Sequence, residues 1–260
     1  MGSATTDLGF AGVAGMPVMN GRITHWDLTP NAGFNGLIDV SFPQTVPASA
    51  TGQRFTVPLA QMPAVHTAPE VVGDPTPTYA SLPLIQNATF TFGAQSTQQT
   101  MLLDSGAQTS IISTTIAQLL GYNLGDPDTV PGSDVLGYIS VMGVGGTVEM
   151  PIIKLSRLGI PADGGHSLVL TDLEVGVLDI EGIAGVIGMN VLTSGYFNAS
   201  DPVTDYGYFA NITLDFTGGQ WVMQLDANPA YVPEPASLGV LMLGAGWLMR
   251  RRGRSVLAPA

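Results

Sequence analysis

The chain has 260 residues, a formal net charge of −12 and no cysteine. The negative charge argues against a nucleic-acid partner, because phosphate binding needs a basic surface. The lack of cysteine excludes disulfides, thiol chemistry and cysteine-ligated zinc. Only 11% of the residues are charged, and there are 33 glycines and 19 prolines. So many turn formers among apolar residues favour short strands over long helices.

The N-terminal part of the chain contains a segment that is repeated later. Residues 10–19 (FAGVAGMPVM) parallel residues 183–192 (IAGVIGMNVL), which indicates an internal structural repeat. The residues before this segment have neither the basic start nor the apolar run of a secretion signal. Residues 23–84 contain closely spaced prolines and are expected to be a linking segment with some strands, such as 37–42 and 54–59.

Residues 85–228 are predicted to form an all-β lobe with one or two short helices. Period-two alternation in ATFTF and VEMPIIKL is typical of strands. A helix is expected at Thr114–Leu120, with Ile116, Leu119 and Leu120 on one face. The expected strands are 88–92, 99–103, 110–113, 135–142, 147–155, 167–170, 173–178, 185–187, 212–216 and 221–225.

The stretch MLLDSGAQTSIIS (101–113) places the carboxylate of Asp104 at the end of an apolar strand, followed by Ser105 and Gly106. A tight polar turn and a catalytic aspartate on a buried loop are both compatible with this pattern. Two later segments bear on the choice. They are the glycine-rich VMGVGGTVEM (141–150) and AGVIGMNVLTSGY (184–196).

In this order the three segments resemble the aspartate loop, the flap and the packing segment of retropepsin-like aspartic proteases. The resemblance covers roughly residues 88–225. It implies a closed β-barrel lobe of the acid-protease type and an endopeptidase activity without cofactor or metal. It also implies a mobile, substrate-binding flap made by Gly143, Val144, Gly145 and Gly146. The third segment would pack beneath the aspartate loop.

The family mechanism that this resemblance implies uses two aspartates about 3 Å apart that share one proton. Asp104 would be one of them. One carboxylate takes a proton from the attacking water, and the other, protonated, donates to the peptide carbonyl. Ser105 would fix the loop by hydrogen bonds to a partner lobe, and Gly106 would let the backbone approach closely.

The second aspartate of such a pair is absent from this sequence, because Asp-Ser-Gly occurs once and Asp-Thr-Gly does not occur. A homodimer could supply it from a second copy. Alternatively, a two-lobed protein would supply it from another lobe. The internal repeat and the lack of a leader favour an N-terminally truncated two-lobed form. Residues 1–22 would then be the remnant of the end of a first lobe.

Residues 229–260 resemble a PEP-CTERM sorting signal. Pro233, Glu234 and Pro235 precede an uncharged apolar run, and a basic cluster follows it at Arg250, Arg251 and Arg252. The resemblance implies an exported bacterial protein and an exosortase-type sorting enzyme as a partner. It also implies at least transient anchoring in the cell envelope through a C-terminal apolar helix. A simple membrane anchor is the alternative.

Other residues with possible chemistry are not predicted to form a site. His25, His66 and His166 lack the spacing of metal ligands. Residues 126–134 (DPDTVPGSD) are rich in oxygen donors but lack the loop spacing of an EF-hand. The leading hypothesis is therefore an aspartic endopeptidase that acts on extended peptides. The rival hypothesis is a non-catalytic surface or extracellular-matrix protein that retains the protease fold for binding or structure.

Overall fold

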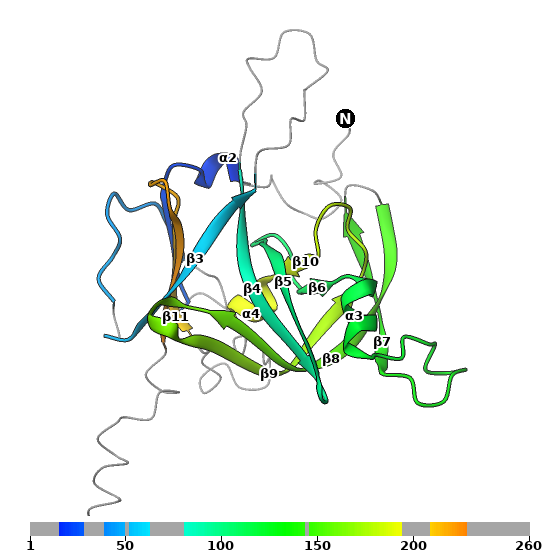
Figure 1. Ribbon diagram of the computed structural model, residues 1–260. Helices are drawn as coiled ribbons and strands as arrows, with labels where there is room; N and C mark the ends of the chain where they lie inside the picture. The colour runs from blue at the N-terminus through cyan, green and yellow to red at the C-terminus, as the bar shows by residue number, and fades with distance from the viewer. Residues whose placement is uncertain are drawn as a thin grey trace, which may run out of the picture.

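A computed structural model describes residues 16–28, 39–49, 52–62, 81–143, 146–193 and 209–227 of the chain. These residues are mostly β with few helices, which confirms the predicted all-β class (Figure 1). The helices are α2 (Met16–Met19), α3 (Thr114–Leu120), α4 (Met189–Leu192) and the 3-10 turn η1 (Asp163–Gly165). The strands are β1 (Ile23–Asp27), β2 (Asp39–Ser41), β3 (Arg54–Met62), β4 (Leu82–Phe92), β5 (Gln95–Leu103), β6 (Ile111–Ile112), β7 (Val135–Gly143), β8 (Gly146–Pro161), β9 (Ser167–Val177), β10 (Gly185–Ile187), β11 (Phe209–Asp215) and β12 (Trp221–Ala227).

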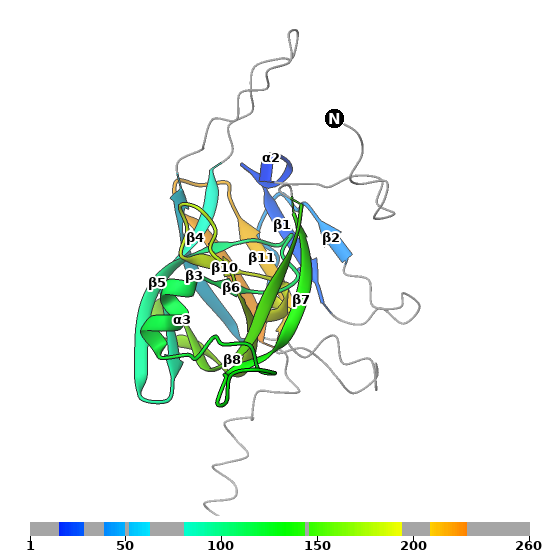
Figure 2. The same cartoon turned by 90° about the vertical axis from the view of Figure 1, so that its right-hand side faces the viewer.

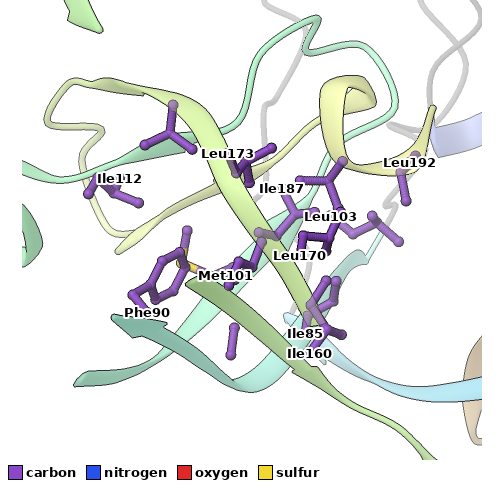
Figure 3. Close-up of a cluster of buried hydrophobic side chains, with 14 of the residues drawn as sticks. Ile85, Phe90, Met101, Leu103, Ile112, Ile160, Leu170, Leu173, Ile187 and Leu192 are labelled. Carbon is purple, nitrogen blue, oxygen red and sulfur yellow. The ribbon is translucent and has the colours of Figure 1, made fainter. Parts of the chain in front are cut away.

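The strands of the predicted lobe are joined in a ring of hydrogen-bonded neighbours. Their order is β4-β5-β10-β6-β9-β8, and β8 also pairs with β4. The inside of this ring is filled by apolar side chains that are almost completely buried (Figure 3). Phe90, Met101 and Ile187, which come from three of the strands, meet there. The additional pairing of β8 with β4 brings the apolar faces of these strands together around a shared core.

Helix α3 covers part of the lobe, and its bounds agree with the prediction. Ser113 caps its N-terminus by accepting a hydrogen bond from the Ile116 N–H, and Gly121 ends it with φ of 87°. Ile116, Ala117 and Leu120 form the buried face. The prediction that Leu119 shares this face was wrong, because that side chain is 59% exposed.

Residues 23–84 contribute to a second, flatter part of the sheet, in the order β2-β1-β11-β12-β3 (Figure 2). The sequence predicted strands near β2 and β3 but not β1. β1 pairs antiparallel with β11, with His25 opposite Thr213 at the centre. The Leu28 N–H donates to the Ala210 carbonyl at one end, and the Phe216 N–H donates to the Arg22 carbonyl at the other. The N-terminal segment is therefore built into the same sheet as the C-terminal strands.

Some predictions concern residues outside the described ranges. They are the first part of the repeat (residues 10–15), the flap tip (residues 144–145) and the whole predicted sorting segment (residues 229–260). Among the helices that the structure does describe, none has the length and apolar character needed to cross a membrane.

A charged pair ties β3 to β12 inside the flatter part of the sheet. Arg54 Nε lies 2.6 Å from Asp226 Oδ1, and its Nη2 lies 2.9 Å from Oδ2. The guanidinium also donates to the Pro47 carbonyl and to Gln224 Oε1. Only 2% of the Asp226 side chain is exposed. A buried two-pronged pair of this kind fixes the position of β3, the strand that leads toward the predicted lobe.

Replacement of Asp226 by alanine is expected to lower the free energy of unfolding by about 3 kcal/mol, because it leaves a partly buried guanidinium without its carboxylate. Urea denaturation measures the change. The exposed pair of Lys154 and Asp172, 3.3 Å apart, provides the control. Lys154→Ala is expected to change stability by less than about 0.5 kcal/mol. Equal effects of both substitutions would contradict this interpretation.

His25 makes the stability of the same sheet depend on pH. Burial lowers the pKa of His25 below its usual value, Asp27 and Asp226 oppose this shift, and Arg54 adds to it. Its Nδ1 lies 2.9 Å from the Thr213 hydroxyl. A histidine whose pKa is lower in the folded state favours folding above its unfolded pKa. That contribution is lost as the pH falls through about 6.5 toward the folded value.

We therefore expect His25→Gln to flatten the dependence of stability on pH between about pH 7 and pH 5. The measurement is the urea midpoint at each pH for the variant and the unsubstituted chain. His166→Gln is the control, since His166 is exposed and lies in a surface turn. If His25→Gln retains the full acid-induced drop in the urea midpoint, His25 is not the group responsible.

Candidate active site

The Asp104 loop joins β5 to β6, and these two strands are not neighbours in the sheet. Strand β10 lies between them, parallel to β5 and antiparallel to β6. The Asp104 N–H donates to the Ile187 carbonyl of β10 at 3.0 Å. The loop therefore crosses the end of β10 before the chain returns as β6. The carboxylate of Asp104, which directly follows the buried end of β5, is in this way held at a fixed place.

The backbone of the loop turns sharply around the Asp104 side chain. The Gly106 N–H donates to Asp104 Oδ1 at 2.8 Å, and the Ala107 N–H donates to the Asp104 carbonyl at 3.3 Å. A Cβ atom at Gly106 would lie 3.2 Å from Oδ1. Asp104 and Ser105 are half-buried and Gly106 is exposed. The loop thus orients the carboxylate and leaves part of it accessible to solvent.

The side chains of Ser110 and Asn190 hold the Asp104 loop in place by hydrogen bonds. Asn190 Oδ1 accepts hydrogen bonds from the Ser110 N–H and from the Ser110 hydroxyl, both at 2.7 Å. The Ser110 hydroxyl oxygen accepts from the Gly188 N–H at 2.9 Å, and Asn190 Nδ2 donates to the Glu174 carbonyl. Ser110 is only 2% exposed. The predicted packing of the third segment beneath the aspartate loop is present in the structure.

Two further backbone contacts bring the start of α4 against the loop. The Met189 N–H donates to the Ala107 carbonyl at 2.8 Å, and the Asn190 N–H donates to the Gln108 carbonyl at 3.1 Å. A Cβ atom at Gly188 would lie 2.7 Å from the Ala107 carbonyl oxygen. Only glycine permits this approach, which explains the glycine at position 188.

The predicted flap is a long hairpin made by β7 and β8. Its last described pair is Gly143 opposite Gly146. Val141 lies opposite Val148, on the same side of the hairpin as the buried Met150. The other side of β7 has no strand paired with it among the described residues. An antiparallel hairpin with one open edge offers backbone groups to an extended chain.

A cavity of about 400 Å³ adjoins the loop at Ser105. Its other lining residues come from both copies of the internal repeat, from the strands β1 and β2, and from the residue that follows β2. They are Val18, Met19, Thr24, Trp26, Val40, Phe42 and Met189. The sequence did not predict this cavity. The repeated Gly-Met sequence was the one available signal, because Met16 and Met189 begin the short helices α2 and α4.

Comparisons with protein-family models and with curated proteins gave no match. Among solved structures, the chain is similar to a retropepsin-like aspartic protease from Rickettsia conorii. That match has 16% identity and a TM-score of 0.33, and covers 56% of this chain and 85% of the other. It is also similar to EIAV protease complexed with the inhibitor HBY-793, with 22% identity and a TM-score of 0.26, over 48% of this chain and 91% of the other.

The coupling between Ser110 and Asn190 can be measured by a double-mutant cycle. Ser110→Ala leaves the buried Gly188 N–H without an acceptor, and we expect it to lower the free energy of unfolding by about 1–3 kcal/mol. Asn190→Ala should lower the free energy of unfolding by a similar amount. Because both residues belong to one network, the double variant should be less destabilised than the sum of the two.

Ser140→Ala serves as the control, because its hydroxyl bonds to Glu149 on the exposed hairpin. Its effect on stability should be within about 0.5 kcal/mol. Strict additivity of Ser110→Ala and Asn190→Ala would show that the two side chains do not brace the loop as one unit.

Proposed function

We propose that this chain is part of a retropepsin-like aspartic endopeptidase, with Asp104 as one of two catalytic carboxylates. The observation that carries the proposal is the position of Asp104. It follows the buried end of β5, its Oδ1 accepts the Gly106 N–H, and its loop is braced by β10 and α4. An ordinary surface turn has no need of a partly buried Ser110–Asn190 brace.

The proposed reaction is hydrolysis of a peptide bond by an activated water. With two carboxylates sharing one proton, the ionised one accepts a proton from the water that attacks the peptide carbonyl carbon. The protonated one donates to the carbonyl oxygen. The amine then leaves with a proton returned by the pair. Asp104 supplies one carboxylate, and the second must come from another polypeptide segment, because Asp-Ser-Gly occurs only once in this sequence.

The proposed substrate is an extended peptide that lies between the Asp104 loop and the β7–β8 hairpin. The open edge of β7 supports this, since an extended chain can add to it as a further strand. The apolar pair of Val141 and Val148 would contact the side chains of that peptide. Ser105 and Gly106 are proposed to position the loop, and Gly143, Val144, Gly145 and Gly146 to form the moving tip.

The C-terminal segment supports a proposal about location. Pro233, Glu234 and Pro235, the apolar run and the arginines at 250–252 favour an exported protein that is sorted to the cell envelope by an exosortase-type enzyme. The single Asp-Ser-Gly favours a second candidate function, a non-catalytic envelope or matrix protein that uses the same fold for binding.

Asp104→Asn is expected to abolish cleavage of an unfolded protein substrate, with a loss of at least about a thousandfold in kcat/KM, because the amide can neither accept nor relay the shared proton. The full-length gene product should be assayed from pH 3 to pH 7 with matched unfolding measurements. Asp163→Asn, an exposed substitution, is the control. Cleavage that persists undiminished in folded Asp104→Asn would leave the non-catalytic candidate.

A further inference from the structure

A second cavity, of about 330 Å³, lies on the outer surface of the strand ring, where β4 runs between β5 and β8. Residues of these three strands and the first residue of β9 line it, and none of them lines the cavity beside Ser105. Ser96 of the lining lies near the start of β5, whereas Asp104 directly follows the end of that strand. Roughly 25 Å of extended chain separates the two residues. This cavity is therefore distinct from the candidate active site.

The outward position of the lining residues follows from the alternation of side chains along each strand. On β4, Phe90 points into the core of the ring (Figure 3), so its neighbour Thr89 points outward. On β8, Leu158 and Ile160 are both 0% exposed, which puts Gly159 on the outer face between them. Gly159 lies directly opposite Thr89. The middle of the cavity floor therefore has no side chain.

The backbone does not require glycine at position 159. Gly159 is not among the residues with positive φ, and a Cβ atom there would make only ordinary contacts, the nearest 3.6 Å from Thr89 Cβ. Gly188 differs in this respect, because a Cβ atom there would collide with backbone. A side chain at position 159 would instead occupy the floor of the cavity. Glycine at this position thus keeps the cavity open.

Arg157 is the one charged residue of the lining. The basic residues in the described part of the chain are Arg22, Arg54, Lys154 and Arg157. Arg54 and Lys154 are each paired with an aspartate, and Arg22 lies against an aromatic ring. Arg157 has no such partner within the described ranges. A guanidinium in this position favours an anionic group, and its planar fork of donors matches a carboxylate.

The neutral lining groups are only weakly bonded to one another. The Thr91 hydroxyl lies 3.4 Å from the Ser96 hydroxyl, and the Gln98 amide donates to the Thr89 hydroxyl at 3.4 Å. The Thr89 hydroxyl donates to the Asn87 carbonyl at 3.5 Å. All three distances exceed the usual range of about 2.7–3.0 Å, so ligand hydroxyls can replace these bonds at little cost. Hydroxyl and amide groups both donate and accept, as the hydroxyls of a sugar do.

We propose that this cavity binds a saccharide that carries a carboxylate, such as a hexuronic acid. Arg157 binds the carboxylate through two parallel hydrogen bonds, and Thr89, Thr91 and Gln98 exchange hydrogen bonds with the sugar hydroxyls. Gly159 leaves room for the ring. An inorganic anion would leave the acceptors of the lining unused, and a neutral sugar would leave the guanidinium without a partner. The inference does not depend on the role of Asp104.

The charge of the whole chain makes such binding selective. At a formal net charge of −12, the protein repels an acidic saccharide at long range, so unspecific attraction does not contribute to binding. The lining of this cavity contains no aspartate or glutamate. Any affinity for an acidic sugar must therefore come from a local arrangement such as the one around Arg157.

Titration calorimetry of the full chain with trigalacturonate, in a buffer that contains EDTA, tests the proposal. We expect one saturable site with a Kd of about 1 mM or lower. Maltotriose, which has the rings without the carboxylates, and sodium sulfate should each bind at least about tenfold more weakly. The absence of saturable trigalacturonate binding below about 10 mM overturns the proposal. Sulfate or maltotriose that binds as tightly as trigalacturonate also overturns it.

Substitutions locate the binding within the molecule. Arg157→Gln should raise the Kd for trigalacturonate at least about tenfold. Lys154→Gln removes the same charge from the same strand, but Lys154 is exposed and paired with Asp172, so the Kd should change by less than about twofold. Gly159→Val should abolish binding, because its side chain fills the floor of the cavity. Asp104→Asn should leave the Kd unchanged.

The urea midpoint of each variant shows whether it folds. If Gly159→Val does not fold, Arg157→Gln decides, since Arg157 is exposed and its replacement leaves the core intact. Equal weakening by Arg157→Gln and Lys154→Gln would indicate a response to net charge alone and would overturn the proposal. Full binding by folded Gly159→Val, or loss of binding in Asp104→Asn, would place the saccharide elsewhere and would also overturn it.

Discussion

The hydrogen bonding of the Asp104 loop is the constraint on which the site depends. β5 and β6 lie on either side of β10, so the loop that joins them must cross the end of that strand. At this place the backbone polar groups of the loop lose hydrogen bonds to water, and they need hydrogen-bond partners within the protein. Ser110, Asn190 and the amides of α4 supply those partners, and a polar loop can therefore lie against an apolar core. The same hydrogen bonds fix the direction in which the Asp104 side chain points.

The glycines of the third segment follow from the same constraint. Gly188 lies where a side chain would collide with the Ala107 carbonyl, and a Cβ atom at Gly185 would lie 2.2 Å from the Ile111 carbonyl oxygen. The loop, β10 and α4 are thus packed too closely for any larger residue. Such close packing makes the position of the carboxylate a property of the strand ring. It does not depend on the loop sequence alone.

The flatter part of the sheet supplies the elements that lie next to the Asp104 loop. β1 and β11 meet about a local two-fold axis, and the Arg54–Asp226 pair holds β3 beside β12. Next to β11 the apolar side chains of Val191, Met223 and Leu225 are buried, whereas next to β1 those of Val18, Val40 and Phe42 are exposed. Ser105, the neighbour of Asp104 in the chain, lines the cavity beside these exposed side chains.

The sequence by itself determined the β class, the helix Thr114–Leu120 and the packing of the third segment against the Asp104 loop, because periodicity, capping residues and close-approach glycines are local signals. It also revealed the repeat. Only the tertiary structure showed that residues 23–62 complete the sheet, that β10 separates β5 from β6, and that Val40 and Phe42 lack the cover that Met223 and Leu225 have. Strand order and burial arise from contacts between residues far apart in the chain, and such contacts leave no mark in a local sequence pattern.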